Sequence, residues 1–361
     1  MVHLADRQRR LAALRDRGIL VIGRDARDRL GAKERAMRIF MMAINDPAGT
    51  AIQFSRALNA EGRHQCRLLT LETRYQHNWE KDLHLPDLGP DGLDTVADLL
   101  RTSDVFYFHM TLDETVRLGP FLPADYLAGK AVVHHHHGHP DFRGHPEKYR
   151  EKYRRLGRKN LLVSTPDLLK KLPEARWQPN LVPVDDPAYA PDATDWTDPA
   201  FWSGPLRLTH APSRRDLKNT DELLATVRDL NAAGQRVDLD LIDNVPHSVC
   251  LARKKAAHAC FDHMQGYFGM SSLESLSQGR AVIAGLDDWD LDAIRGFVGE
   301  TTPIPWLIAR DAQALRTRLA ELAADPDRRR AAGQAARRFM VEHWSDRRCA
   351  AALADFLDTI E

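Results

Sequence analysis

The stretch GYFGMSSLESLSQGRAVIAG, residues 266–285, contains the clearest structural pattern in the chain. It reads as a turn at Gly269, a helix that begins near Met270, a glycine that ends the helix, and a buried strand. Ser271 and Ser272 lie in the first turn of that helix, where free amide groups and the positive end of the helix dipole attract phosphate. Gly269 lets the backbone approach a ligand closely. The stretch therefore predicts a phosphate site at a helix N-terminus.

Glu274 lies one turn inside the same helix. A carboxylate does not bind phosphate, but it accepts two hydrogen bonds from a ribose diol, so the combination predicts a nucleotide. Another interpretation stays open, because Ser271 and Glu274 also fit a capping box and Gly269 fits a simple turn.

Strand-like and helix-like segments alternate on both sides of this stretch. The predicted strands are 37–45, 66–71, 104–110, 130–135, 161–164, 206–212, 237–243, 260–264 and 281–286. The predicted helices are 51–62, 95–102, 147–157, 167–172, 220–234, an alanine-rich helix that ends near His258, and 271–279. Such alternation predicts an α/β fold with parallel, doubly wound sheets.

A proline-rich interval divides the alternation into two halves, and the chain from Asp311 onward is nearly all helical in pattern. We expect five parts along the chain. They are a basic helical extension (1–35), a Rossmann-like domain (36–190), a linker (191–205), a second Rossmann-like domain (206–340) and a C-terminal helix (341–361) that packs back on the first domain.

Composition sets limits on the class of protein. The chain has 361 residues, 43% of them hydrophobic and 28% charged, which fits about two folded domains and excludes a fibre or a disordered chain. The formal net charge is zero, so global charge does not indicate a nucleic-acid or membrane partner. The four cysteines are far apart and form neither a zinc ribbon nor a disulfide framework. With no signal-peptide pattern and no membrane-spanning stretch, we expect a cytoplasmic protein, at most peripheral to a membrane.

The motif at 266–285 resembles the donor-binding motif of retaining GT-B glycosyltransferases, the family 4-like group (group 1). Gly266-Tyr267-Phe268-Gly269, then Glu274-Ser275, then Gly279 and an apolar strand follow the order of that motif. The family has a glutamate eight residues before Glu274, where this chain has Gly266, so a side chain that the family uses on the donor sugar is missing. The resemblance covers roughly Arg38 to the C-terminus.

The resemblance implies a GT-B fold, with two Rossmann-like domains that face a cleft and with C-terminal helices. The first domain would serve the acceptor and the second the nucleotide-sugar donor. The implied activity is transfer of a hexosyl or related group (EC 2.4) to an acceptor hydroxyl with retention of configuration. The co-substrate would be a UDP-sugar or a GDP-sugar, without a tightly bound cofactor. Two alternatives stay open, a sugar-nucleotide epimerase on the same fold and a catalytically silent nucleotide-sugar-binding protein.

In this family a loop arginine and a lysine five residues later clamp the donor diphosphate. Lys218 in HAPSRRDLKNT matches the lysine, while Ser213 stands at the arginine position with Arg214 beside it. Fixed cations would stabilise a departing diphosphate, although a solvated basic loop is also possible. The resemblance thus implies donor contacts at Gly49, Ser213, Arg214, Lys218, Gly269, Met270, Ser271, Ser272 and Glu274, and nucleobase contacts at Asp243, Pro246 and His247.

The first domain contributes two further candidate segments. The loop NDPAGTA follows the first strand, and the resemblance places Asn45, Asp46 and Gly49 beside donor and acceptor, with Arg143 also on the acceptor side. The chain has no G-x-G-x-x-G pattern, which argues against a nicotinamide dehydrogenase.

The segment HHHHGHP, residues 134–140, has five histidines in six positions. Successive strand residues face opposite sides, so these imidazoles do not all converge on one ion, and we predict no metal site. In the resembled family a histidine at the end of this strand lies near the transferred sugar. His136 and His137 are therefore the candidate catalytic residues of this segment, and Asp262 is a third candidate.

Residues 143–159 carry eight Lys or Arg against two Glu, with Tyr149 and Tyr153 four residues apart. This is either a solvated basic helix or a surface for an anionic acceptor. The acceptor classes considered are a lipid-linked or envelope glycan at a membrane surface and DNA bearing hydroxylated bases. Residues 1–35 add ten Lys or Arg against five acidic residues.

Overall fold

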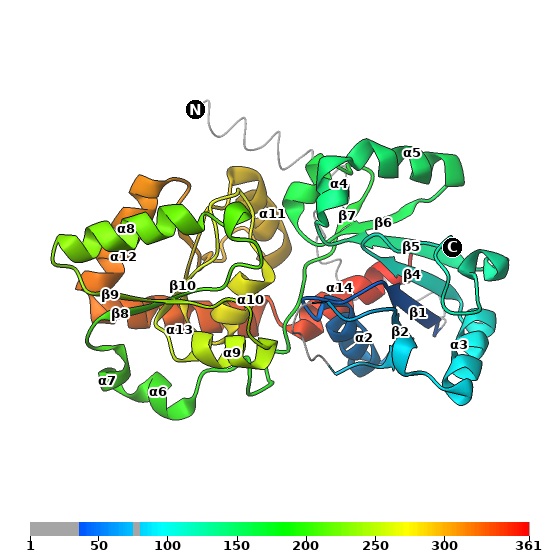
Figure 1. Cartoon of the computed structure of the whole chain (residues 1–361), viewed down its shortest axis with the longest axis horizontal. Coiled ribbons are helices and arrows are strands. Elements are labelled where there is room, and N and C mark those ends of the chain that lie inside the picture. The colour runs from blue at the N-terminus through cyan, green and yellow to red at the C-terminus, as the bar shows by residue number, and fades with distance from the viewer. Residues whose placement is uncertain (1–35, 75–79, 361) are drawn as a thin grey trace. The chain divides into compact units, whose positions relative to one another are not determined.

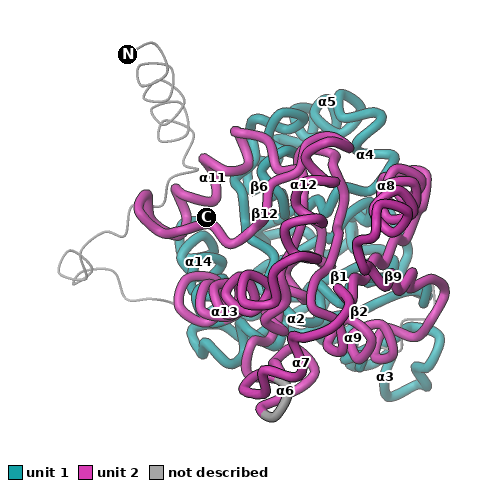
Figure 2. Tube along the Cα trace, turned by 90° about the vertical axis from the view of Figure 1, so that its left-hand side faces the viewer, with its two compact units in different colours: residues 1–181, 347–361 teal, residues 182–346 magenta. Residues whose placement is uncertain are grey.

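The computed structural model describes residues 36–74 and 80–360, so the predicted basic extension at 1–35 lies outside the described residues. The chain forms two compact units (Figure 2). Unit 1 ends at Leu181 and resumes at Arg347, and unit 2 is Val182–Asp346. The border at Val182 precedes the predicted linker, and residues 191–205 carry two short helices of unit 2, α6 (Ala193–Thr197) and α7 (Pro199–Trp202).

Unit 1 is built on a seven-stranded parallel sheet with the order β3-β2-β1-β4-β5-β6-β7 (Figure 1). The strands are β1 (Arg38–Ala43), β2 (Gln65–Thr70), β3 (Leu83–His84), β4 (Val105–His109), β5 (Ala131–His136), β6 (Asn160–Val163) and β7 (Arg176–Trp177). The helices of unit 1 are α2 (Thr50–Glu61), α3 (Pro90–Thr102), α4 (Pro140–Gly144), α5 (Pro146–Leu156) and α14 (Asp346–Leu357). The central strands are almost wholly buried, as expected of a parallel sheet covered on both faces.

The C-terminal helix α14 packs within unit 1. The Arg63 guanidinium donates to the Asp355 carboxylate (2.9 Å), the Asp358 carboxylate (2.7 Å) and the Ala351 carbonyl (3.1 Å). The Gln178 amide donates to the carbonyl of Cys349 at 3.0 Å. Polar contacts thus join the end of the chain to a unit whose other residues lie more than 160 positions earlier.

Unit 2 has a five-stranded parallel sheet with the order β12-β11-β10-β8-β9. The strands are β8 (Leu206–His210), β9 (Val237–Leu241), β10 (Ala259–Phe261), β11 (Ala281–Ala284) and β12 (Leu307–Ile308). The longer helices are α8 (Thr220–Ala232), α9 (His247–Lys255), α10 (Met270–Ser277), α11 (Asp288–Val298), α12 (Ala312–Ala324) and α13 (Pro326–His343). Leu208, Phe261 and Ile283 on adjacent strands are fully buried in its core.

Most predicted segments coincide with observed elements, and α10 begins at Met270 as predicted. The predicted helix 167–172 is wrong, because Pro166–Lys170 forms a 3-10 helix. The edge strands β3, β7 and β12 have two residues each and are too short to produce a periodic signal. Among the described residues, no helix has the length and apolar character needed to cross a membrane.

Candidate functional site

Asp262 occupies the N-terminus of α10, where the sequence predicts phosphate. It directly follows β10 and is buried, and one carboxylate oxygen accepts hydrogen bonds from the Gly269 amide (2.6 Å) and the Ser272 hydroxyl (2.7 Å). Burial raises the pKa of Asp262, but His263, Lys218 and these hydrogen bonds hold it well below the usual range. Two of the donors predicted for phosphate are therefore engaged by a carboxylate of the same unit.

Lys218 reaches this helix end from the loop after β8. Its Nζ lies 3.4 Å from the other oxygen of Asp262, and its side chain keeps about a fifth of its surface exposed. A Cβ at position 269 would lie 3.2 Å from the Asp262 carboxylate and 3.3 Å from Lys218 Nζ. Gly269 thus allows the cation and the carboxylate to approach the backbone, and the structure brings Lys218, Asp262, Gly269 and Ser272 together.

The other predicted donor-loop residues lie outside this cluster. Arg214 is more than half exposed and forms an ion pair with Asp216, two residues away, while Ser213 is exposed. The neighbouring Arg215 donates to Asp243 at 2.8 Å, which joins the loop to one predicted nucleobase residue. Lys218 lies at the start of α10, beside Asp262 and Gly269.

Glu274 is held in a buried charge cluster. One carboxylate oxygen is 2.8 Å from His247 Nε2, and the other accepts from Lys254 Nζ at 2.5 Å. Glu274 and Lys254 are almost fully buried. Although burial raises the pKa of Glu274, Lys254 and His247 lower it from 4.5 to about 2. The charged glutamate is therefore an integral part of unit 2.

Sequence reasoning missed Lys254. It lies in the run Arg253-Lys254-Lys255, where no local feature distinguishes it from its neighbours. Its spacing from His247 could have indicated a shared partner. Lys254 is seven residues after His247, which places it two turns along the same face of a helix. Pro246, a predicted nucleobase residue, is the N-cap of α9 and starts this helix at His247.

The acceptor-side candidates have structural partners in unit 1. Asp46 accepts from the amides of Ala51 (3.1 Å) and Ile52 (2.9 Å) and so caps α2. Burial raises its pKa to about 6 against the effect of these hydrogen bonds. Gly49 takes a left-handed backbone (φ 65°) at the turn into the helix, and Asn45 donates to Glu72 at 3.2 Å.

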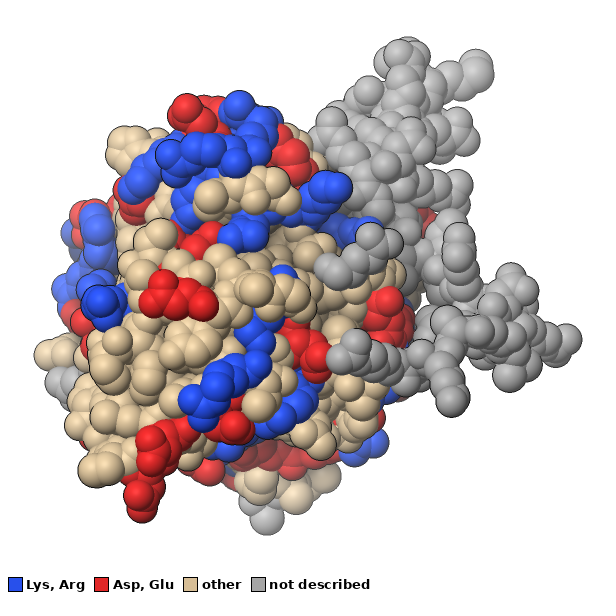
Figure 3. Space-filling model, turned by 90° about the vertical axis from the view of Figure 1, so that its right-hand side faces the viewer, with Lys and Arg blue, Asp and Glu red and all other residues tan. Residues whose placement is uncertain are grey.

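The basic segment of residues 143–159 is heavily ion-paired. Its cations contact acidic residues of the same unit in the pairs Arg143–Asp167, Lys148–Asp141, Arg150–Glu174, Lys152–Asp113 and Arg158–Glu114. Figure 3 views the right-hand side of Figure 1. At the top of that view, at the height of α5 in Figure 1, blue Lys and Arg side chains are interspersed with red Asp and Glu side chains. Tyr149 and Tyr153 are buried, so these two aromatic side chains are not part of any exposed surface that α5 offers to an anionic acceptor.

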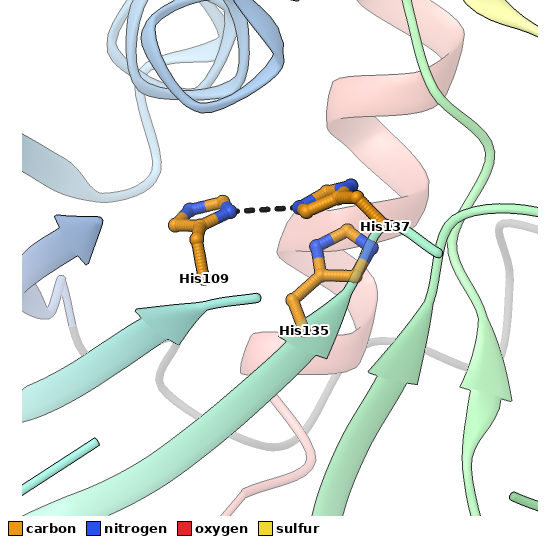
Figure 4. Close-up of side chains that lie close together, drawn as sticks. All are labelled: His109, His135 and His137. Atoms are coloured by element: carbon orange, nitrogen blue, oxygen red, sulfur yellow. Dashed lines mark hydrogen bonds between the residues drawn. The ribbon is translucent and has the colours of Figure 1, made fainter. Parts of the chain in front are cut away.

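The histidine run divides between the two faces of β5. His136 is fully buried, with Nε2 2.7 Å from the Tyr153 hydroxyl and its ring stacked on Phe142 at 3.9 Å between centroids. His137 is partly exposed and lies with its Nε2 2.9 Å from Nδ1 of His109 (Figure 4). The two catalytic candidates of this run therefore have different surroundings, because adjacent strand residues point in opposite directions.

Comparison with known proteins supports the fold. No protein-family model matches the chain, and no curated protein matches it by sequence. An alpha-glucosyltransferase solved in complex with UDP-glucose and DNA containing an abasic site is similar, with a TM-score of 0.62 and 12% identity over 89% of this chain and 99% of that chain. HepE from Anabaena, solved with UDP and glucose, has a TM-score of 0.59 and 9% identity over 90% of this chain and 100% of that chain. The chain has an α/β fold of the GT-B type.

Proposed function

We propose that the chain transfers a sugar from a UDP-sugar to an acceptor hydroxyl with retention of configuration, as a glycosyltransferase similar to family 4. The observation that carries the proposal is the partly exposed Lys218 ammonium at the N-terminus of α10. The fold adds support, because two proteins of similar fold were solved with UDP-glucose or with UDP and glucose.

Lys218 and Asp262 have separate roles in this proposal. Asp262 is a positioning residue, since it bonds the Gly269 amide and the Ser272 hydroxyl and holds the first turn of α10 in place. The 3.4 Å contact with Asp262 leaves Lys218 with further N–H groups to donate. Lys218 would contact the donor diphosphate through these further N–H groups.

Glu274 would bind the ribose through its His247 side. Lys254 is more deeply buried than His247, whose side chain is 12% exposed, so His247 is the partner that a ribose diol could displace or join. The arrangement keeps Glu274 ionised, and an ionised carboxylate accepts hydrogen bonds without competing as a donor.

The reaction breaks the bond between the anomeric carbon and the diphosphate oxygen and forms a bond from that carbon to the acceptor oxygen. The acceptor proton goes to the leaving diphosphate, which therefore replaces a protein base. Lys218 stabilises the negative charge that develops on this leaving group. Acceptor identity stays a prediction, with lipid-linked or envelope glycan and DNA bearing hydroxylated bases as the classes to test.

The test is product analysis with a panel of UDP-sugars and GDP-sugars, with and without candidate acceptors. We expect UDP release from one donor, and a fall in turnover of about 100-fold or more in Lys218→Ala. Lys218→Arg should recover part of the activity, and Arg228→Ala, an exposed residue on α8, should match the parent.

Two outcomes would contradict the proposal. Formation of an epimeric nucleotide sugar without acceptor would identify an epimerase. Tight donor binding without turnover under every acceptor would identify a nucleotide-sugar-binding protein.

A further inference from the structure

Three histidines of unit 1 converge at the carboxyl end of the sheet. His109 ends β4, His135 lies in β5, and His137 follows the end of that strand. Each offers one ring nitrogen, and these three nitrogens all lie within 4.8 Å of one another. Figure 4 shows a hydrogen bond between the nearly parallel rings of His109 and His137, with His135 beside them.

The strand geometry explains why these three meet. His109 pairs with His135 in the parallel register of β4 and β5, so both side chains lie on the same face of the sheet. His137 is two residues after His135 and returns to that face, whereas His134 and His136 point to the other. The sequence prediction of no metal site considered the run 134–139 alone. That run places two imidazoles on one face, and the third, His109, comes from the neighbouring strand.

The spacing of two of these nitrogens fits a metal ion. Two imidazoles on one Zn²⁺ at about 2.0–2.1 Å per bond have nitrogens roughly 2.9–3.4 Å apart for angles of about 90–110°. His109 Nδ1 and His137 Nε2 are 2.9 Å apart. The same pair can instead share one proton as a hydrogen bond, and the experiment below separates the two cases.

The third ligand is oriented by a hydroxyl. Tyr107 is fully buried, and its hydroxyl lies 2.8 Å from His135 Nδ1. This contact leaves His135 Nε2, which is buried and has no hydrogen-bond partner among the described residues. A hydrogen bond to one ring nitrogen is the usual way in which proteins orient a metal-binding histidine.

The ring nitrogens of the cluster suit coordination, because a neutral imidazole carries the lone pair that a metal requires. When an ion binds His109 Nδ1, the ring proton of His109 resides on its Nε2. Like His135 Nε2, this nitrogen is buried and has no hydrogen-bond partner in the described part of the chain.

We propose that His109, His135 and His137 bind one divalent transition-metal ion, with Zn²⁺ as the best-suited class. Three nitrogen ligands and no carboxylate favour Zn²⁺, Co²⁺ or Ni²⁺ over Mg²⁺ and Ca²⁺, which prefer oxygen. Three protein ligands leave a coordination position for water or a substrate oxygen. This site goes beyond the proposed sugar transfer, in which Lys218 of unit 2 acts on the donor.

The test is Co²⁺ and Zn²⁺ titration of tag-free full-length protein that has been freed of metal by dialysis against a chelator. We expect one ion per chain, visible absorption bands of tetrahedral or five-coordinate Co²⁺, and displacement of Co²⁺ by Zn²⁺. His137→Gln changes the most exposed of the three ligands, and it should weaken Zn²⁺ binding about 100-fold or more while circular dichroism stays unchanged.

Two further variants sharpen the result. Tyr107→Phe should weaken Zn²⁺ binding about 10-fold or more, because it frees the His135 ring from its oriented state. His145→Gln alters an exposed histidine outside the cluster and should bind Zn²⁺ as the parent does. Absence of Co²⁺ bands in the parent, or equal Zn²⁺ affinity in His137→Gln and the parent, would show that the cluster is only a hydrogen-bonded histidine network.

Discussion

Replacing Lys254 by Met tests the buried charge cluster of unit 2. Lys254 and Glu274 are 2% and 4% exposed, so the substitution removes the cation and leaves a buried carboxylate that keeps its contact with His247. The chain length of methionine is close to that of lysine, and the change therefore removes the charge with little change in packing volume.

The magnitude follows from the pKa of Glu274. A fall from 4.5 to about 2 in the folded state corresponds to about 3 kcal/mol of stability at neutral pH. Breaking a buried pair by removing one partner costs about 3–5 kcal/mol, which agrees with that value. Because the folded pKa is depressed, this stability is present above pH 4.5 and is lost as the pH falls from there toward 2.

Hydrogen exchange at the amides of α10 measures the effect locally, since a chain of two units need not unfold in one step. We expect Lys254→Met to lower the opening free energy of α10 by about 3 kcal/mol at pH 7. The double variant Lys254→Met with Glu274→Leu should recover most of this loss, because it leaves no unpaired buried charge.

The matched control is Arg253→Met in the same helix. Its ion pair with Asp240 is partly exposed, so its loss should cost no more than about 1 kcal/mol. If Lys254→Met destabilises α10 by no more than this control does, the reasoning about the buried pair is wrong.

Three further predictions concern packing, pH and charge. Gly279→Ala should lower the stability of unit 2 by about 2 kcal/mol or more, because the new Cβ would lie 2.1 Å from the Trp196 ring and the backbone at this position has a φ of 69°. In denaturant unfolding, Gly234→Ala should cost less, because its Cβ would meet no atom within 4 Å. The stability of unit 1 should fall as the pH rises from about 4 to about 6, because the raised pKa of Asp46 favours the protonated carboxyl in the folded state. In a pH series of unfolding curves, Asp46→Asn should flatten this dependence. Arg154→Glu with Arg155→Glu changes two exposed residues of α5, and it should weaken sedimentation with anionic vesicles at low salt while thermal stability stays unchanged. Because the α5 tyrosines are buried, any vesicle binding should be electrostatic, and binding that persists at high salt would contradict this prediction.

The sequence alone determined the alternating architecture and the helix that begins at Met270. These features depend on local patterns, namely apolar runs of strand length, helical periodicity, and the glycines at the ends of α10. The place of Glu274 one turn inside that helix singled it out as a candidate ligand residue. Lys218 and the loop at Asp46 were singled out by the resemblance to a glycosyltransferase family and not by these patterns.

The contacts of these residues depend on the tertiary fold. Lys254 neutralises Glu274 from another helix, Asp262 takes the helix end predicted for phosphate, and His109 joins His135 and His137 from an adjacent strand. Such partners come from segments 7 to 28 residues away, at spacings set by loop lengths and strand order. Periodicity shows which face of its own helix or strand a side chain occupies. The partner that it meets on that face depends on the order of the strands in the sheet. Strand order and burial together therefore set the charges and hydrogen bonds of the site.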